Sequence, residues 1–309
     1  QKQNKMTKHE NYIIETKNLS FSFGKFKVLN KISLHVPQGS IYGFLGPNGA
    51  GKTTTIKILL SLLKIKSRKA YLFGKDITGW RLYTLERTGA MVEMPSLYDH
   101  LTGYENVEIT RILRGLDKKR TDEVLKIVHM TRDAQRFVRH YSTGMKQRLS
   151  LAAALLSEPE LLILDEPING LDPGGIIEIR NLLIKLNQTR GITIFLSSHI
   201  LSEIEKLCTH VAIINKGNLL YQGTMEELQQ KKTTINRLNI ETDDNEKAAG
   251  ILRKEYTVVP GESNLVCEYK AKDESANIIR LLVENGLAVY QAKIEVADLE
   301  DSFLSIINQ

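Results

Sequence analysis

A phosphate-binding pattern follows the short apolar run Ile41–Leu45. It reads Gly46-Pro47-Asn48-Gly49-Ala50-Gly51-Lys52-Thr53, followed by Thr54, and matches G-x-x-x-x-G-K-[ST]. Glycines without a Cβ let backbone N–H groups converge on phosphate oxygens, and a helix after the loop points its positive end at the same anion. Lys52 would reach the β- and γ-phosphates, and the Thr53 hydroxyl would hold Mg²⁺. A glycine-rich turn before an ordinary helix is the alternative, but a strand before the loop and a helix after it favour nucleotide binding.

Two adjacent carboxylates follow a second apolar run. Leu161–Leu164 predicts a central strand, so Asp165 and Glu166 would emerge at its carboxyl end, where α/β sheets bind ligands. Asp165 suits a ligand of Mg²⁺, and Glu166 would polarise the attacking water. The alternative is a solvated turn after the strand, and the phosphate-binding pattern upstream disfavours it.

The elements around these residues predict an α/β fold with a parallel core. A helix is predicted over 52–63, where apolar residues recur at helical spacing, and buried strands over 161–164 and 192–196. Loose apolar alternation over 12–36 predicts antiparallel strands, and residues 97–157 predict a helical subdomain.

A second, smaller α+β domain is predicted over 233–309, after a first domain over 1–232. Its strands and helices follow the order β-α-β-β-α-β, the ferredoxin-like pattern. One amphipathic helix over 299–307 is expected to follow.

Composition limits the function classes. Of the 309 residues, 25% are charged and 42% hydrophobic, which are ordinary values for globular protein and argue against fibres and long disorder. Aromatic residues make up only 6%, so an aromatic-rich carbohydrate or single-strand binder is not favoured. No apolar run approaches the ~18 residues that span a bilayer, so we expect a soluble chain. The net charge is +6, with basic clusters at 64–69, 118–120 and 231–232; solvated faces are the favoured interpretation, and attraction to anionic lipid or nucleic acid is the alternative.

Three further motifs follow the phosphate-binding pattern in order. They are Tyr141-Ser142-Thr143-Gly144-Met145, then Asn169-Gly170-Leu171-Asp172, then His199 after Ser197-Ser198. Ser142 lies 23 residues before Asp165. Together they resemble the signature motif, the D-loop and the switch histidine of ABC transporter ATP-binding subunits, and the resemblance covers residues 10–230.

The resemblance implies a P-loop ATPase domain with a RecA-like parallel core, an antiparallel β subdomain and a helical subdomain. In that family the signature closes over ATP held by the opposite subunit, so Ser142, Thr143, Gly144 and Met145 would contact nucleotide, as would Asp172. The usual L-S-G-G-Q is changed here at Tyr141, Thr143 and Met145, whereas Ser142 and Gly144 remain. Ser142 would also cap a helix, and this role is compatible with the ATP contact.

Two more residues take roles from the resemblance. His199 would position the γ-phosphate and the attacking water beside the catalytic Glu166, although a lone histidine after a buried strand is more often structural. Phe23 falls where the family has an aromatic residue that stacks on adenine. A core phenylalanine on a strand beside Phe21 stays an open alternative.

Glu93 stands where the family usually has glutamine, which contacts Mg²⁺ and communicates with the membrane domain. A glutamate at this position, with the motifs at 142–148 and 200–205, resembles the subgroup that serves bacitracin export and lantibiotic self-protection. A carboxylate can replace the glutamine oxygen as a metal ligand, but it adds negative charge near the phosphates. A solvated carboxylate on a loop is the alternative.

The resemblance implies an ATP- and Mg²⁺-dependent subunit of a bacterial exporter or immunity pump for a peptide antibiotic. It would act at the cytoplasmic face of the cell membrane with integral permease subunits and a second ATP-binding subunit. The competing hypothesis is a soluble ABC ATPase acting on ribosomes or nucleic acid. Such proteins usually carry two cassettes or a long coiled-coil insert, and here the phosphate-binding pattern occurs once without sustained heptads, so no nucleic acid partner is expected.

Overall fold

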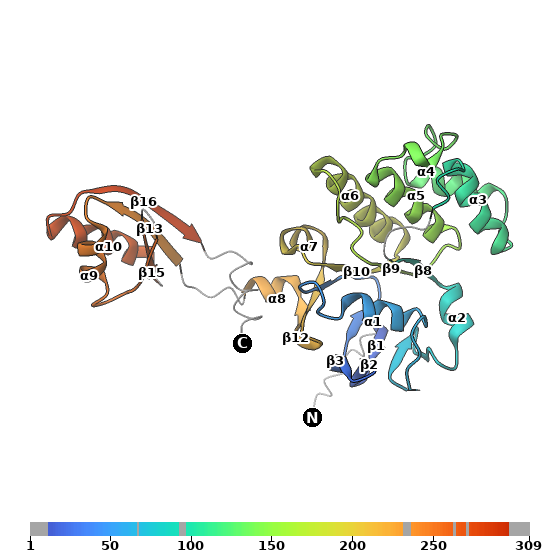
Figure 1. The fold of residues 1–309 in the computed structure, drawn as a ribbon, viewed down its shortest axis with the longest axis horizontal. Coiled ribbons are helices and arrows are strands. Elements are labelled where there is room, and N and C mark those ends of the chain that lie inside the picture. The colour runs from blue at the N-terminus through green and yellow to red at the C-terminus, as the bar shows by residue number, and fades with distance from the viewer. Residues whose placement is uncertain are drawn as a thin grey trace, which may run out of the picture. The chain divides into compact units, whose positions relative to one another are not determined.

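The computed structural model describes residues 12–66, 68–92, 97–230, 236–261, 264–269 and 272–296. The chain divides into two compact units, residues 1–226 and 227–309 (Figure 1). The predicted helix over 299–307 lies outside the described residues. The predicted domain boundary near residue 232 stays a prediction.

A six-stranded sheet forms the centre of the first unit. All neighbouring strands are parallel except β11 and β12, which pair antiparallel. Buried on both faces, β9 is wholly apolar, as a central parallel strand requires. The predicted parallel core is thereby confirmed. In spatial order the strands are β12 (Asn218–Thr224), β11 (His210–Asn215), β5 (Ile41–Leu45), β10 (Thr193–Ser198), β9 (Leu161–Leu164) and β8 (Thr88–Met91).

Antiparallel strands from the amino-terminal segment share a core with this sheet. Phe44, Ile163 and Phe195 of the sheet pack in one cluster with Ile56 of α1 (Lys52–Leu59) and Ile14 of β1 (Tyr12–Thr16). The antiparallel strands predicted over 12–36 are present. They are β1 (Tyr12–Thr16) and β4 (His35–Pro37), which pair with each other, and β2 (Leu19–Phe23) with β3 (Phe26–Ile32) in a two-stranded ribbon. Two strands outside the predicted range, β6 (Ala70–Leu72) and β7 (Lys75–Asp76), complete the sheet of β1 and β4.

Helices cover both faces of the central sheet. Figure 1 shows α1 on one side of it and α5 and α6 on the other. The α3, α4 and α5 helices pack on one another in the segment where a helical subdomain is predicted. The helices of the first unit are α1 (Lys52–Leu59), α2 (Arg81–Glu86), α3 (Gly103–Leu113), α4 (Lys119–Ile127), α5 (Thr143–Leu155), α6 (Pro173–Arg190) and α7 (Leu201–Leu207); α8 (Met225–Gln230) spans the division between the units.

The helix after the phosphate-binding loop ends earlier than predicted. Apolar spacing predicts a helix to residue 63, but α1 ends at Leu59. Ser61 has a φ of +55°, a left-handed conformation that stops the helix. Leu62 consequently lies on a loop and is 59% exposed.

The second unit has the predicted β-α-β-β-α-β order. Its four strands form one antiparallel sheet in the order β14, β15, β13, β16. Leu238, Ile240 and Cys267 of the strands pack against Leu252 and Ile278 of the two helices. The elements are β13 (Asn236–Thr242), α9 (Asn245–Leu252), β14 (Thr257–Pro260), β15 (Leu265–Tyr269), α10 (Lys272–Glu284) and β16 (Val289–Val296).

Within the described part of the chain, none of the helices combines the length and the apolar character needed to cross a bilayer.

An ion pair joins the end of α2 to the segment before β9. Both Arg87 Nε and Nη2 donate to Glu160 carboxylate oxygens at 2.6 Å, and these bonds lower the pKa of Glu160 from its ordinary value near 4.5. A depressed folded-state pKa stabilises the fold above the unfolded-state pKa, and this stabilisation is lost as the pH falls through the folded-state value.

We therefore expect Glu160→Gln to destabilise the first unit at pH 7 by about 0.5 kcal/mol, because the pair is half exposed. Near pH 3 the difference from wild type should vanish. Urea unfolding at both pH values measures it, with Glu86→Gln, which removes an exposed carboxylate of α2, as the control. An equal loss at both pH values would contradict the ion-pair explanation.

Candidate functional site

Two glycines fix the backbone of the phosphate-binding loop between β5 and α1. A Cβ on Gly46 would lie 2.2 Å from the carbonyl oxygen of Ile214, so no larger residue fits there. Gly51, the N-cap of α1, has a φ of +110°, which only glycine adopts readily. The loop therefore delivers the unpaired N–H groups of the first turn of α1 to one place, as anion binding at a helix start requires.

The ammonium of Lys52 is surrounded by oxygen atoms. Its Nζ donates to the carbonyl oxygens of Gly46 at 2.7 Å and Pro47 at 3.3 Å. It also lies 3.1 Å from Oε1 of Glu166. The side chain is only 5% exposed, so these partners replace the water that a buried cation would otherwise need. The structure thus brings the predicted phosphate-binding cation and the predicted catalytic carboxylate into direct contact.

Asp165 lies between the phosphate-binding loop and β10. Its Oδ2 accepts a hydrogen bond from the Thr53 hydroxyl at 2.7 Å, and its Oδ1 accepts one from the Ser197 hydroxyl at 2.5 Å. Asp165 is 6% exposed. One hydroxyl and one carboxylate therefore meet beside the loop, and hard oxygen donors of this kind, completed by phosphate oxygens, are what Mg²⁺ binds. The donor set fits a magnesium ion.

Glu166 contacts two predicted site residues at once. Its Oε1 faces Lys52, while its Oε2 lies 3.0 Å from Nδ1 of His199. An ionised carboxylate can only accept, so in this contact Nδ1 is the donor and Nε2 is left for another partner. The φ of Glu166 is +49°, an uncommon conformation for a residue with a side chain. Its backbone N–H is held by the hydroxyl oxygen of Ser197 at 2.9 Å.

A pocket of about 360 Å³ opens over the loop and is lined on one side by aromatic residues. Phe23, at the end of β2, is 54% exposed, which rules out the core alternative for this residue. Phe26, at the start of β3, is 73% exposed and lines the same pocket. The other lining residues are Val28, Asn48, Gly49, Gly51, Lys52, Thr53, Thr54 and Glu166. Ala50, also predicted to bind nucleotide, is buried and does not line this pocket.

The signature residues lie apart from this pocket. Ser142 is the N-cap of α5, and its hydroxyl oxygen accepts a hydrogen bond from the Met145 N–H at 3.3 Å. Ser142 and Thr143 are exposed, and Gly144 and Met145 partly so. Asp172 likewise caps α6 by accepting from the Gly175 N–H at 3.2 Å. None of these predicted residues lines the pocket over the loop, and Glu93 lies outside the described residues.

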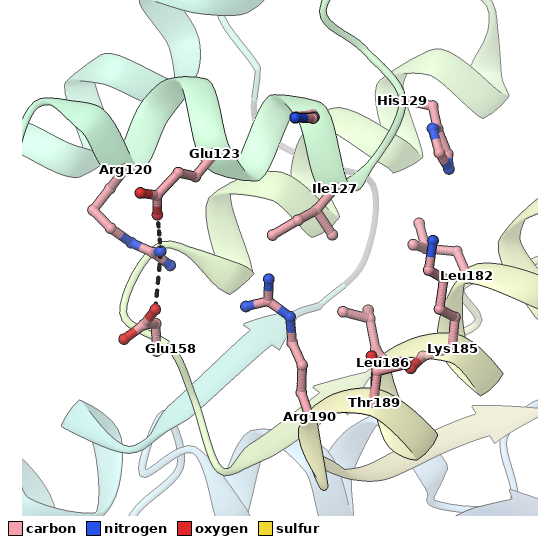
Figure 2. A pocket seen from close by; sticks show the side chains of 11 residues that line it. Arg120, Glu123, Ile127, His129, Glu158, Leu182, Lys185, Leu186, Thr189 and Arg190 are labelled. Carbon is pink, nitrogen blue, oxygen red and sulfur yellow. Dashed lines mark hydrogen bonds and ion pairs between the residues drawn. The ribbon is translucent and has the colours of Figure 1, made fainter.

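A larger cavity, of about 640 Å³, lies between α4 and α6 (Figure 2). Figure 2 shows Arg120 between the carboxylates of Glu123 and Glu158, with Arg190 across the cavity. None of the predicted site residues that the structure describes lines it. Volume alone therefore does not identify the site, whereas the converging phosphate-binding loop, lysine and carboxylates do.

Sequence reasoning missed two residues of the site. Ser197 holds both Asp165 and the backbone of Glu166, whereas the motif Ser197-Ser198-His199 predicts a role for His199 alone. The sequence feature that could identify Ser197 is its position at the carboxyl end of a buried strand, which the structure places next to β9. Phe26 lines the same pocket as Phe23. The sequence feature that could identify it is a second phenylalanine directly after the turn at Gly24-Lys25.

The fold and the site define an ATPase of the P-loop class. Comparisons with known proteins narrow this class: the family model described as ABC transporter matches residues 29–169. Bacitracin transport ATP-binding protein BcrA of Enterococcus faecalis is 41% identical over 300 residues, which are 96% of each chain. Lantibiotic transport ATP-binding protein SrtF of Streptococcus pyogenes is 38% identical over 222 residues, 70% of this chain and 95% of that protein.

A solved structure agrees with these relatives. The structure of cbiO1 from Clostridium perfringens, part of the ABC transporter complex cbiONQ, has a TM-score of 0.66 and 28% identity, covering 72% of this chain and 92% of that one. The chain belongs to the ABC transporter family, as an ATP-binding and ATP-hydrolysing subunit.

We expect Ser197→Ala to lower ATP turnover by about 10- to 100-fold while nucleotide affinity changes little. The substitution removes the hydroxyl that orients Asp165 and Glu166 but leaves the phosphate-binding loop intact. Steady-state turnover and equilibrium nucleotide binding separate the two effects. Ser198→Ala is the matched control, because among the described residues the Ser198 hydroxyl bonds only to the backbone of Ile200. Equal effects of the two substitutions would contradict this role of Ser197.

Proposed function

We propose that this ABC ATPase subunit drives export of a peptide antibiotic from a bacterial cell. The observation that carries the proposal is the similarity to the bacitracin transport protein over 96% of both chains, which includes the second unit. The lantibiotic transport relative supports the same substrate class for the ATP-binding unit. Bacitracin and lantibiotics are peptides, so the proposed cargo is a peptide antibiotic.

Magnesium would be held by the Thr53 hydroxyl and the Asp165 carboxylate, which are already hydrogen-bonded to each other. A bound Mg²⁺ offsets the charge of the phosphate oxygens in the transition state. Glu93 as a further ligand stays a prediction from the sequence. Ser197 keeps the Asp165 carboxylate in one orientation, so that Oδ2 faces Thr53.

The remaining chemistry belongs to three side chains. Lys52 binds the β- and γ-phosphates by exchanging its contact with Glu166 for phosphate oxygens. Glu166, released from the lysine, accepts a proton from the attacking water as a general base. His199 holds the Glu166 carboxylate through Nδ1 and presents Nε2 to the water or the γ-phosphate.

A second copy or a homologous subunit would complete each site. Ser142, Thr143 and Gly144 lie at the exposed start of α5 and do not line the pocket over the phosphate-binding loop of their own chain. A helix start with free N–H groups suits the γ-phosphate of ATP held by the partner, and Asp172 would lie at the same interface. Membrane-spanning permease subunits, as expected for a transporter, would couple closure of this dimer to movement of the peptide.

We expect Glu166→Gln to slow hydrolysis by about 100-fold or more while ATP binding survives. The amide cannot accept the proton, and its neutral charge frees Lys52 for the phosphates, so the ATP-bound dimer should accumulate. Lys52→Ala should instead weaken ATP binding by about 10- to 100-fold, because a charge-assisted contact to phosphate is lost. Nucleotide affinity, dimer fraction with ATP and turnover are measured for both variants. Near-normal turnover of Glu166→Gln would require another base.

Expression of the chain together with its membrane subunits should raise the inhibitory concentration of bacitracin or a lantibiotic severalfold in a sensitive bacterium. The same cells should gain no resistance to an antibiotic that is not a peptide. Glu166→Gln, expressed at the same level, should abolish the protection because the transporter cannot turn over. Protection by the inactive variant would indicate sequestration of the drug and would contradict export.

A further inference from the structure

The positive charge of this chain is concentrated in one short segment. Residues 57–87 contain eight lysines and arginines and two carboxylates, Asp76 and Glu86. Their net charge equals the +6 of all 309 residues, so the rest of the chain is balanced. None of the predicted site residues lies in this segment, and ATP hydrolysis gives no reason for its charge.

Several of these cations are exposed and form no ion pair within the described part of the chain. Lys64, Lys66 and Arg68 are exposed at alternate positions of the loop after α1, and Arg81 is exposed at the start of α2. Among the described residues, no carboxylate forms an ion pair with Lys64, Lys66 or Arg81. Their charge is therefore free to act on a partner from outside the chain.

Contacts hold the loop after α1 and the start of α2 together as one surface. A hollow of about 500 Å³ is lined by the apolar side chains of Leu62, Leu63, Ile65 and Ile77, together with Lys64 and Arg81. The backbone N–H of Arg68 donates to Asp76 at 2.8 Å, which ties the loop to β7. An apolar hollow flanked by unpaired cations suits an anion that carries a hydrocarbon part.

Large apolar side chains are exposed beside the cations. Trp80 is 51% exposed, and its ring lies 4.7 Å from Nζ of Lys75, while Leu62 and Leu82 are 59% and 76% exposed. Tryptophan next to lysine and arginine is the composition found at membrane–water interfaces, where the ring lies at the headgroup level and the cations meet lipid phosphates. Trp80 and Leu82 flank Arg81 in the sequence, and Arg81 lines the hollow together with Leu62. Exposed apolar side chains of this size are typical of interaction surfaces.

We propose that this surface, the basic patch of Leu62, Lys64, Lys66, Arg68, Trp80 and Arg81, binds the anionic phospholipid headgroups of the bilayer. The inference rests on the proposed function only because a transporter subunit works next to a membrane. Each cation near an anionic bilayer contributes about 1 kcal/mol, or roughly fivefold in binding. Four exposed cations with two apolar anchors are enough for reversible attachment.

A nucleic acid is a poorer occupant. Its phosphates would satisfy the cations, but the apolar hollow and the exposed Leu62 would gain nothing from a polyanion. A phospholipid satisfies both, because its phosphate meets Lys64 and Arg81 while acyl carbons contact the hollow. A permease surface is the other possible partner, and the experiment below distinguishes it from lipid.

Trp80 is the single tryptophan of the chain, so its fluorescence reports on this patch alone. The full-length protein is mixed with vesicles of phosphatidylcholine, or of phosphatidylcholine with 30% phosphatidylglycerol. We expect a blue shift of the emission with the anionic vesicles only, quenching by brominated acyl chains, and reversal at high salt. If the emission with both vesicle types stays the same as in buffer, the proposal is overturned. A third sample, with vesicles that contain the permease, tests the other partner: a shift with these vesicles alone would assign the patch to the permease and would also overturn the proposal.

Charge removal localises the contact. Lys64→Gln combined with Lys66→Gln and Arg81→Gln should weaken sedimentation with the anionic vesicles by about 100-fold, at roughly fivefold per cation. The matched control removes the same charge from the cavity between α4 and α6, with Lys126→Gln, Lys185→Gln and Arg190→Gln, and should bind like wild type. Equal losses in both triple variants would mean nonspecific attraction and would overturn the patch.

Nucleotide binding by both triple variants establishes that they are folded. Lipid binding is measured without permease or peptide. It can therefore be absent while ATP turnover and drug export are intact, and it can be present while drug export is absent. A failure of the inferred surface and a failure of the proposed function therefore give different results.

Discussion

The buried ammonium of Lys52 is the charge around which this site is organised. At 5% exposure it cannot rely on water, and an unpaired buried cation costs several kcal/mol. The carbonyl oxygens of Gly46 and Pro47 and the carboxylate of Glu166 satisfy it. These oxygens follow the carboxyl ends of β5 and β9. The parallel sheet therefore positions the oxygen atoms that make burial of the Lys52 charge tolerable. A phosphate that displaces Glu166 exchanges one anionic partner for another, which keeps the burial of Lys52 tolerable.

Local sequence patterns were sufficient to predict the loop and the carboxylates. Residues 46–53 and 161–166 are each contiguous, and four apolar residues in a row are compatible with a strand buried on both faces. In a parallel sheet the carboxyl ends of strands lie at one edge, so Asp165 and Glu166 had to approach the phosphate-binding loop. The parallel core is confirmed for this reason, and the β-α-β-β-α-β order of the second unit follows from its alternating periodicities.

Contacts between distant segments could not be predicted in this way. Ser197 reaches Asp165 only because β10 pairs with β9 in the register that places Leu196 beside Leu164. Phe26 faces the pocket because the ribbon of β2 and β3 turns at Gly24, whose φ is +57°. The early end of α1 is a third case, since Leu62 and Leu63 continue the apolar pattern while the backbone of Ser61 turns away. Residue types indicate which side chains can be buried, but the path of the backbone determines which of them are buried.

The charges around the phosphate-binding loop support the proposal that a partner subunit completes the site. Lys52 is one cation, and Asp165 and Glu166 are two carboxylates, so these side chains are net negative before a triphosphate adds several more negative charges. The positive end of α1 offsets only part of this repulsion, because a helix terminus is equivalent to about half a charge. Binding and catalysis therefore require further positive charge, and the proposed Mg²⁺ at Thr53 and Asp165 is one source. The start of α5, exposed and capped by Ser142, is the other source in the proposed dimer, because it does not line the pocket over the loop of its own chain.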